Sequence, residues 1–234
     1  MKIKTELPAR YDASWQEPFE DPVLEKLRPG DSLLDVGSGR HPAIPPSRRP
    51  FNIEYVGLDL SQDELDAAEP GGYDETIAAD ATTFVPALAE RFDAVVSWQV
   101  LEHVQDLEAT LENIRRYLKP GGLFVALFSG SWSAFAVINR ILPDRIGHRI
   151  VDRVMKRTEN NIPVFPAYYD RCSSRAFSPL LENWTSVDIT PLYFGATYFH
   201  FSPLLVRTYL AYEDFLIRRQ ISNLATHYMI HATR

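Results

Sequence analysis

The chain has 234 residues, of which 45% are hydrophobic, 24% are charged and 12% are aromatic. This composition excludes a disordered or collagen-like chain, and the length fits one domain that carries an insertion. The 24 Lys and Arg residues against 31 Asp and Glu residues give a net charge of −7, which argues against a general binder of nucleic acid.

Three short apolar runs in the first part of the chain predict buried parallel strands, at residues 32–37, 53–60 and 75–80. A tight turn, Gly37-Ser38-Gly39, ends the first of them. Ser61 and Glu64 form a capping box, which predicts a helix from about residue 62 to residue 69.

The rest of the chain continues this alternation of strands and helices. Strands are predicted at 92–98, 123–129, 186–192 and 226–233, and helical patterns lie at 107–118, 174–183 and 203–219. Such alternation requires crossover connections, which make neighbouring strands parallel and place helices on both faces of the sheet. We therefore expect an α/β fold with a doubly wound, mostly parallel sheet of seven strands.

Cys172 is the single cysteine, so the chain forms no internal disulfide and no multi-cysteine zinc site. The start, MKIKTELPAR, lacks the apolar stretch of a secretory signal, and no apolar run approaches the roughly 18 residues of a membrane span. We therefore expect a cytoplasmic protein. No spacing typical of metal ligands lies at the predicted ligand edge, so we expect no metal site.

Residues suited to binding a nucleoside follow three of the predicted strands. Gly37, Asp59 and Asp80 lie at carboxyl ends, where doubly wound sheets bind ligands. The glycine turn allows close approach to a ligand, and a carboxylate can accept hydrogen bonds from both hydroxyls of a ribose. A dinucleotide would also fit these parts, but Pro42 occupies the sixth position of its GxGxxG motif. The prolines at 42–50 also disfavour the helix that would bind a pyrophosphate.

An ordered set of motifs resembles the class I S-adenosylmethionine-dependent methyltransferases of small-molecule type. The matching segments cover roughly residues 30–130; they are LLDVGSG (33–39), VGLDLS (56–61), AAD (78–80), FDAVVSWQVLEHV (92–104) and LKPGGLFVA (118–126). The resemblance implies a Rossmann-like sheet in one methyltransferase domain, residues 1–234. It also implies an N-terminal lid segment at 1–30 and an inserted substrate cap at 131–176, between the fifth and sixth strands.

The resemblance also implies which residues contact the cofactor. For the methionine part these are Asp35, Gly37, Ser38 and Gly39, with Trp98 and Gln99 near the transferred methyl group. For the nucleoside they are Asp59 at the ribose, Leu60 against the adenine, and Asp80 and Ala81 at its amino edge. Tyr11 and Trp15 resemble an aromatic segment that folds over the cofactor in many members.

Some of these residues also have a structural interpretation. Asp35 would serve as well by bonding the backbone of the turn, whereas for Asp80 the capping of a turn is the weaker alternative. Trp98, Tyr11 and Trp15 would serve as well in core packing. The chain also departs from the family, with His41 where a glycine is usual and a proline-rich loop in place of the first helix.

Histidine is the commonest general base for a hydroxyl nucleophile. His103 follows the fourth strand, His148 lies in the insertion, and His200 precedes the last strand, so these three are the candidates. His227 and His231 alternate along the last strand and are expected to be structural. Cys172 has no evident partner and is expected to be buried and inert.

Two segments outside the cofactor motifs are suited to choosing an acceptor. The stretch from Arg140 to Arg157 has six basic residues against two acidic ones, a local net charge of +4, and residues 165–170 are aromatic and suited to an acceptor pocket. The amphipathic stretch at 203–219 is rich in aromatic residues. Such stretches usually pack on their own domain or on a second subunit, so an oligomer is left open. Contact with an anionic membrane or a lipid-linked acceptor is the alternative.

These features together predict transfer of a methyl group from S-adenosylmethionine to a small molecule, with S-adenosylhomocysteine as the product. The expected acceptor is a hydroxyl on a secondary metabolite or on a glycan or glycolipid precursor, and no nucleic acid is expected as a partner. Two alternatives remain open. One is C-methylation of a quinone or polyketide-like acceptor, and the other is an accessory protein that binds S-adenosylmethionine without turnover.

Overall fold

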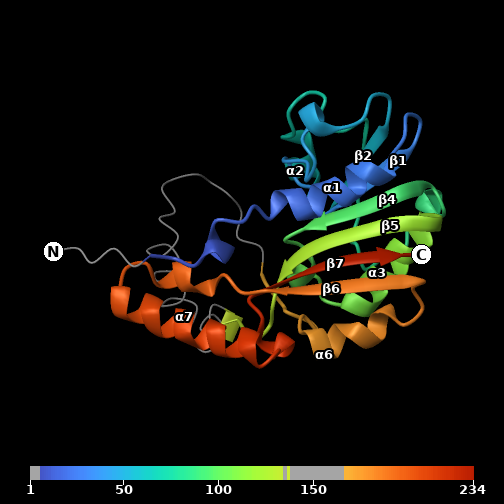
Figure 1. Cartoon of the computed structure of the whole chain (residues 1–234). Helices are drawn as coiled ribbons and strands as arrows, with labels where there is room; N and C mark the ends of the chain where they lie inside the picture. The colour runs from blue at the N-terminus through green and yellow to red at the C-terminus, as the bar shows by residue number, and fades with distance from the viewer. Residues whose placement is uncertain (1–5, 134–135, 138–165) are drawn as a thin grey trace.

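Seven strands form one sheet in the order β3-β2-β1-β4-β5-β7-β6. The computed structural model describes residues 6–133, 136–137 and 166–234 (Figure 1). The strands are β1 (Ser32–Val36), β2 (Glu54–Asp59), β3 (Glu75–Ala78), β4 (Phe92–Trp98), β5 (Leu118–Ser129), β6 (Ser186–Leu192) and β7 (His227–Thr233). β1 to β5 pair in parallel, and β7 is antiparallel to both β5 and β6. The predicted fold class is confirmed.

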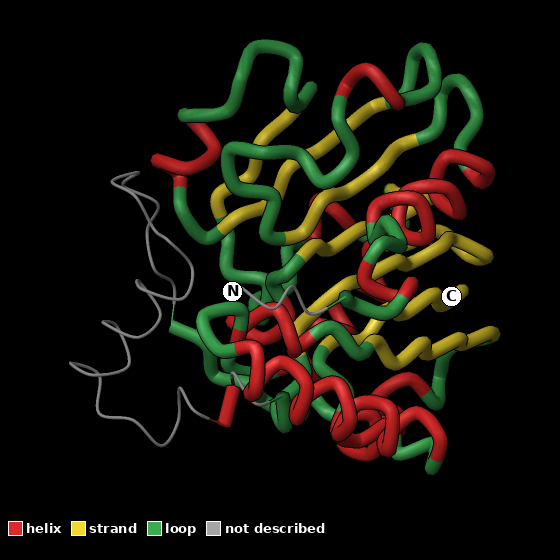
Figure 2. Tube along the Cα trace, turned by 60° about the vertical axis from the view of Figure 1, so that its left-hand side comes forward, coloured by secondary structure: helices red, strands yellow, loops and turns green. Residues whose placement is uncertain are grey.

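Helices cover both faces of this sheet, as Figure 2 shows. The described helices are α1 (Gln16–Lys26), α2 (Gln62–Asp66), α3 (Leu107–Tyr117), α6 (Ser174–Phe177) and α7 (Pro203–Arg218). Phe19 and Val23 of α1 pack on one face with Val96 of β4, while Leu111 and Ile114 of α3 pack on the other. Side chains alternate along a strand, so each strand contributes to two separate hydrophobic clusters.

Some predicted boundaries differ from the observed ones. The helix expected at 62–69 ends at Asp66, and that expected at 174–183 is α6 followed by a 3-10 turn at Ser178–Leu181. Pro179 lacks the N–H that a continuing α-helix would use. The loop at 42–50 contains a 3-10 turn at Pro46–Arg48 and no α-helix, as its prolines predict. The predicted cap at 131–176 falls mostly outside the described residues, and the basic stretch from Arg140 to Arg157 lies wholly outside them.

The antiparallel direction of β7 brings its first residue to the carboxyl edge of the parallel strands. His227 pairs with Ser129, the last residue of β5, and with Leu192, the last residue of β6. Gly130 allows this close approach, because a Cβ there would lie 2.4 Å from the Ala225 carbonyl oxygen. The start of β7 therefore belongs to the same edge as Gly37, Asp59 and Trp98.

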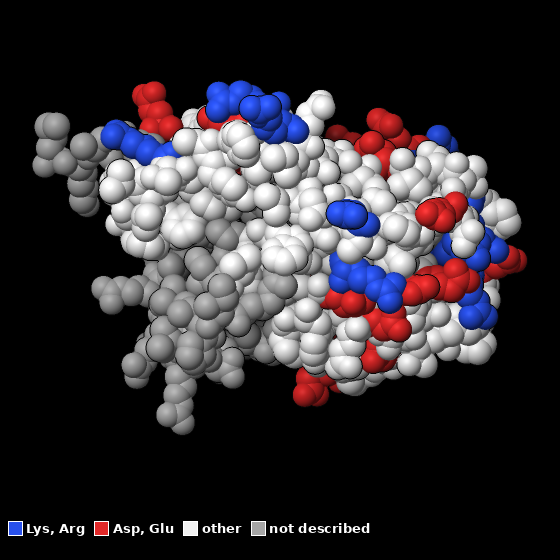
Figure 3. All heavy atoms as spheres, turned by 90° about the horizontal axis from the view of Figure 1, so that it is seen from below, with Lys and Arg blue, Asp and Glu red and all other residues white. Residues whose placement is uncertain are grey.

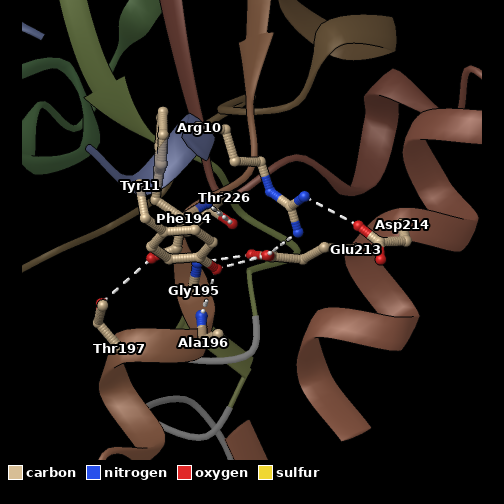
Figure 4. A network of polar contacts seen from close by, with 9 residues as sticks. All are labelled: Arg10, Tyr11, Phe194, Gly195, Ala196, Thr197, Glu213, Asp214 and Thr226. Atoms are coloured by element: carbon tan, nitrogen blue, oxygen red, sulfur yellow. Dashed lines mark hydrogen bonds and ion pairs between the residues drawn. The ribbon is translucent and has the colours of Figure 1, made fainter. Parts of the chain in front are cut away.

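The N-terminal segment is tied to α7 by a network around Glu213 (Figure 4). Glu213 is 1% exposed, and its Oε2 accepts hydrogen bonds from the Arg10 guanidinium at 3.1 Å and the Tyr11 hydroxyl at 2.5 Å. Its Oε1 accepts from the Gly195 N–H at 2.7 Å. Arg10 also pairs with Asp214 at 2.8 Å. One buried carboxylate thus joins three segments that are far apart in the sequence.

Replacing Glu213 tests this network. Glu213→Ala leaves the Tyr11 hydroxyl and the Gly195 N–H without their acceptor and removes one of the two carboxylates paired with Arg10. We expect the free energy of unfolding to fall by about 3 kcal/mol. Asp214→Ala is the matched control, because Asp214 is 45% exposed and its loss leaves the Arg10 pair with Glu213 in place, so we expect a fall of under about 1 kcal/mol. Urea denaturation measures both, and equal effects would contradict the role of Glu213.

Candidate functional site

A cavity of about 290 Å³ opens at the carboxyl edge of β1, β2 and β4. Nine of the residues predicted from the sequence line it: Gly37, Gly39, Asp59, Leu60, Asp80, Ala81, Trp98, Gln99 and His103. They come from the four segments that follow β1, β2, β3 and β4, and the crossover connections bring them together because these strands all end at one edge.

The turn after β1 depends on glycine. Gly37 has a φ of 74°, and a Cβ at this position would lie 2.3 Å from a methyl carbon of Val100. Its N–H donates to the Leu58 carbonyl oxygen at 2.7 Å, which ties the turn to the end of β2. Gly39 also has a positive φ, of 51°. The backbone of the turn therefore forms one wall of the cavity, and no side chain at these positions fills the space.

Asp59 holds this turn and also faces the cavity. Its Oδ2 accepts from the Gly39 N–H at 2.9 Å, and its Oδ1 accepts from the Ser61 N–H at 2.8 Å. Each carboxylate oxygen can accept about two hydrogen bonds, so the group keeps capacity for two hydroxyls of a ligand. The two backbone donors fix the carboxylate in place before a ligand arrives.

Asp80 caps a turn and lines the cavity at the same time. Its Oδ1 accepts from the N–H and the hydroxyl of Thr82, both at 2.8 Å. Beside it, Ala81 and the 69% exposed Leu60 give the cavity an apolar wall. This end of the cavity therefore offers a flat apolar surface bordered by a carboxylate.

Asp35 takes the structural role that the sequence left open. It is 1% exposed, and its Oδ2 accepts from the Ala43 N–H and the Tyr55 hydroxyl, both at 2.8 Å. These bonds hold the proline-rich loop against β1 and β2. Burial raises the pKa of Asp35 to about 6. A direct contact between Asp35 and the cofactor stays a prediction.

A second cavity, of about 230 Å³, lies on the other side of the glycine turn. Asp35, Ser38 and His41 line it, and Gly37 and Trp98 line both cavities. The buried Ser38 hydroxyl oxygen has no hydrogen-bond partner among the described residues. This oxygen lies against β2, because a Cβ at Gly57 would be 2.8 Å from it.

Tyr11 and Trp15 lie beside Phe194 and do not line the main cavity. The Tyr11 ring meets the Phe194 ring edge-on at 5.8 Å between centroids, and the Trp15 ring lies 4.6 Å from it. The residue after Trp15, Gln16, lines the second cavity. A contact of Tyr11 or Trp15 with the cofactor stays a prediction.

The three candidate bases lie in different places. His103 lines the main cavity, with its Nδ1 3.0 Å from the Pro166 carbonyl oxygen. His200 is exposed and does not line this cavity. Its Nδ1 lies 2.9 Å from the Thr197 carbonyl oxygen in its own turn. His148 lies outside the described residues. His103 is therefore the candidate that the fold brings to the cavity.

The sequence analysis named neither Glu64 nor Gln105 as a site residue, and both also line the cavity. Glu64 forms a bidentate pair with Arg40, at 2.6 and 2.7 Å, and Gln105 donates to the hydroxyl of Tyr168 at 3.1 Å. Pro166 and Tyr168, from the aromatic stretch at 165–170, form the far wall. The position of Gln105 just after the Leu101-Glu102-His103-Val104 segment is a signal that could have found it.

Comparison with known proteins identifies the family. A family model described as "Methyltransferase domain" matches residues 10–142. A ubiquinone biosynthesis O-methyltransferase of Bartonella tribocorum is 36% identical over 127 residues, which cover 50% of each chain. One of Bradyrhizobium sp. (strain ORS 278) is 28% identical over 167 residues, which cover 62% of this chain and 66% of that protein. The chain spans about half the length of most of these curated relatives.

Solved structures share the fold at low sequence identity. A geranyl diphosphate C-methyltransferase of Streptomyces coelicolor A3(2), in complex with S-adenosyl-L-homocysteine, has a TM-score of 0.57 and 17% identity, covering 94% of this chain and 74% of that one. Phosphoethanolamine N-methyltransferase 2 of Haemonchus contortus has a TM-score of 0.56 and 14% identity, covering 94% and 52%. At these identities the likeness establishes the fold alone.

The raised pKa of Asp35 gives a pH dependence of stability that can be measured. In the folded chain the Asp35 carboxyl keeps its proton up to about pH 6, whereas in the unfolded chain it loses the proton near pH 3.8. The protonated carboxyl therefore contributes fully to stability below pH 3.8, and this contribution is lost as the pH rises through 6. The loss amounts to about 1.4 kcal/mol per pH unit within this window.

Asp35→Asn removes this titration. We expect the wild type to lose stability relative to Asp35→Asn as the pH rises from about 4 to 6. Above about pH 7 the difference between their free energies of unfolding should be constant. Urea denaturation at successive pH values measures it. The exposed Asp63, changed to Asn, is the control for the exchange of a carboxyl for an amide, and its effect should stay under about 0.5 kcal/mol. A flat profile for Asp35→Asn would contradict the burial of an ionisable carboxyl.

Proposed function

This chain belongs to the methyltransferase domain family that its residues 10–142 match, and from that premise we propose that it transfers a methyl group from S-adenosylmethionine to a hydroxyl of a small molecule. S-adenosylhomocysteine is then the second product. The observation that carries the proposal is the fixed Asp59 carboxylate beside the glycine turn, at the edge of the sheet where this family binds its methyl donor.

The cavity residues fit the parts of the donor. Asp59 has the capacity to accept hydrogen bonds from two ribose hydroxyls, and Leu60 and Ala81 offer apolar surface to the adenine. Asp80 suits the amino edge of that base. On the other side of the glycine turn, the second cavity, which Ser38 and His41 line, suits the charged methionine end. The two cavities meet at Gly37 and Trp98, which is where the resemblance puts the transferred methyl group.

The protein's part in the reaction is to position the acceptor and keep water out. The bound donor supplies an electrophilic methyl group, because its sulfonium carries a positive charge. An acceptor oxygen must then lie in line with the carbon–sulfur bond, which is mainly an effect of proximity and orientation. Trp98, Pro166 and Tyr168 give the cavity an apolar and aromatic side that suits a flat acceptor.

A hydroxyl acceptor is supported by the curated relatives, which are named as O-methyltransferases. Since their names give ubiquinone biosynthesis, a hydroxylated aromatic ring is the acceptor class we propose to examine first. His103 lines the cavity and is a candidate to take the hydroxyl proton, while His148 and His200 stay predictions.

The outward face of α7 supports a contact with lipid. Five apolar residues of this helix are exposed, namely Leu204, Leu205, Tyr212, Phe215 and Ile217. Arg207, Arg218 and Arg219 are exposed on the same helix and its end. Figure 3 looks onto the side where α6 and α7 lie, and the described residues left of its centre expose mainly uncharged side chains. Among the described residues, no helix has the length and hydrophobicity to span a bilayer.

Donor binding can be tested through Asp59. Asp59→Ala removes the acceptor of the ribose hydroxyls, and hydrogen bonds to a charged group contribute about 1.5–3 kcal/mol. We therefore expect the affinity for S-adenosylhomocysteine, measured by calorimetry, to fall about 10- to 100-fold. Asp63→Ala, an exposed acid on α2, is the matched control and should bind as the wild type does. Unchanged binding by Asp59→Ala would show that the nucleoside lies elsewhere.

The lipid contact can be tested with vesicles. We expect the chain to sediment with vesicles containing phosphatidylglycerol at low salt and to be released at high salt, because arginines near anionic headgroups are screened by ions. Arg218→Gln combined with Arg219→Gln should weaken this binding, whereas Arg175→Gln, on α6, should not. No sedimentation at low salt would contradict the contact.

A further inference from the structure

We propose that the side-chain amide of Gln99 donates a hydrogen bond to the acceptor oxygen during methyl transfer, and that Ser129 holds this amide in position. The inference rests on the proposed O-methylation and names the residue that binds the reacting oxygen. Three observations carry it: the place of Gln99 in the main cavity, the orientation of its amide and the conformation of its backbone.

Gln99 lies directly after β4, at the part of the cavity where the methyl group is expected. It follows Trp98, which lines both cavities, whereas Gln99 lines the main cavity only. The resemblance to the family puts both residues near the transferred methyl group. The strands that lead to the proposed nucleoside residues, β2 and β3, are separated from β4 by β1. Gln99 therefore belongs to the part of the edge next to the methyl group.

Ser129, the last residue of β5, orients the Gln99 amide. Its hydroxyl donates to the Gln99 Oε1 at 3.2 Å, and its own N–H donates to the buried Glu102 carboxylate at 3.1 Å. An amide accepts hydrogen bonds only through its oxygen and donates only through its nitrogen. A hydroxyl bound to the oxygen therefore turns the –NH2 group of Gln99 away from Ser129.

The amide nitrogen of Gln99 is available to a ligand. In the part of the chain that the structure describes, no group accepts a hydrogen bond from Nε2. This nitrogen is not among the buried atoms that lack a partner, so it keeps accessible surface. Because Gln99 lines the main cavity, two N–H hydrogens are available there for an oxygen of a bound molecule.

The backbone of Gln99 has an uncommon conformation. Its φ is 57°, a value that residues other than glycine seldom adopt. Its N–H bonds the Leu127 carbonyl oxygen at 2.7 Å, and this bond together with that of Ser129 holds the residue in place. Such conformations occur often at functional sites. A glycine would adopt this φ without strain, so a glutamine here indicates a use for the side chain.

The charge on the amide hydrogens favours the acceptor over the methyl donor as their partner. These hydrogens are partly positive, so they repel a sulfonium and attract an oxygen that carries negative charge. The donor also has a carboxylate, but its methionine end is proposed for the second cavity, which Gln99 does not line. The acceptor oxygen is therefore the group that the amide suits best.

The amide acts on the reacting oxygen without taking its proton. The acceptor hydroxyl gives its proton to a base in the cavity, for which His103 is the candidate. The resulting oxyanion accepts a hydrogen bond from the Gln99 Nε2, which raises the share of bound acceptor in its reactive form. As this oxygen bonds the methyl carbon, the carbon–sulfur bond breaks and its electron pair remains on sulfur.

The colour of a bound phenol tests the amide directly. The probe is 4-nitrocatechol bound together with S-adenosylhomocysteine, because its neutral and ionised forms absorb at different wavelengths. We expect the pKa of the bound probe to be about 1–2 pH units higher in Gln99→Leu than in the wild type, since hydrogen bonds to charged groups are the stronger ones. Gln99→Glu has the same size but no N–H, and its carboxylate repels an oxyanion, so the rise should be larger.

Gln220→Leu is the matched control for this measurement. Gln220 has a φ of 53°, close to that of Gln99, but it is exposed and lines neither cavity. The same substitution in the same backbone conformation should therefore leave the pKa of the bound probe at its wild-type value.

Turnover and donor binding separate the role of the amide from folding. With S-adenosylmethionine and catechol, we expect kcat/KM of Gln99→Leu to fall about 10- to 100-fold, with affinity for S-adenosylhomocysteine within about threefold of the wild type. Ser129→Ala frees the amide to turn and should lower kcat/KM about three- to tenfold. Ser129→Thr keeps the hydroxyl and should retain the wild-type value.

An unchanged pKa of the bound probe in Gln99→Leu would overturn the inference and leave the proposed function standing. So would a loss of S-adenosylhomocysteine affinity as large as the loss in kcat/KM, because it would put the amide on the donor. Wild-type turnover in Ser129→Ala would contradict the positioning role of Ser129. A wild-type chain that binds S-adenosylhomocysteine but neither binds nor methylates a phenol would overturn the proposed function and the inference with it.

Discussion

The site depends on the contact between the glycine turn after β1 and the carboxylate that ends β2. The Gly37 N–H donates to the Leu58 carbonyl oxygen, and the Gly39 N–H donates to the Asp59 carboxylate. These two hydrogen bonds join the ends of the neighbouring strands β1 and β2. A side chain at position 37 would collide with Val100, which ties the turn to the segment after β4 as well. Because these bonds form without a ligand, the cavity is arranged before one binds, and a preorganised site loses less entropy on binding.

A second constraint acts on the other half of the sheet. The antiparallel β7 brings His227 to the edge where the parallel strands end, and the close approach at Gly130 allows it. Glu213 then fixes Phe194 and the N-terminal segment over this edge. The edge thus has one part at the ends of β1, β2 and β3, which carries the main cavity, and another part at the ends of β5 and β6 and the start of β7. Trp98 and Gln99 of the β4 segment lie between them.

The grouping of the cavity residues at one edge could be predicted from the sequence, because its signals are local. Apolar runs mark the strands, and Asp59 and Asp80 follow them directly, so their place at the ligand edge follows from strand direction alone. The packing over the ends of β5 and β6 could not be predicted in this way. Tyr11 bonds Glu213 across 202 positions of the chain, and such a contact leaves no periodic pattern. Alternation along a strand also does not reveal which end of β7 meets the ligand edge.

The central claim is that this chain joins a methyl group from S-adenosylmethionine to an acceptor oxygen. The most direct measurement gives the chain S-adenosylmethionine labelled with carbon-13 in its methyl group, together with a panel of phenols and catechols, and identifies the labelled product by NMR. The account predicts the label on an oxygen of the acceptor and one S-adenosylhomocysteine for each labelled product. Label on a carbon atom, or an unlabelled panel in the presence of tight S-adenosylhomocysteine binding, would contradict it.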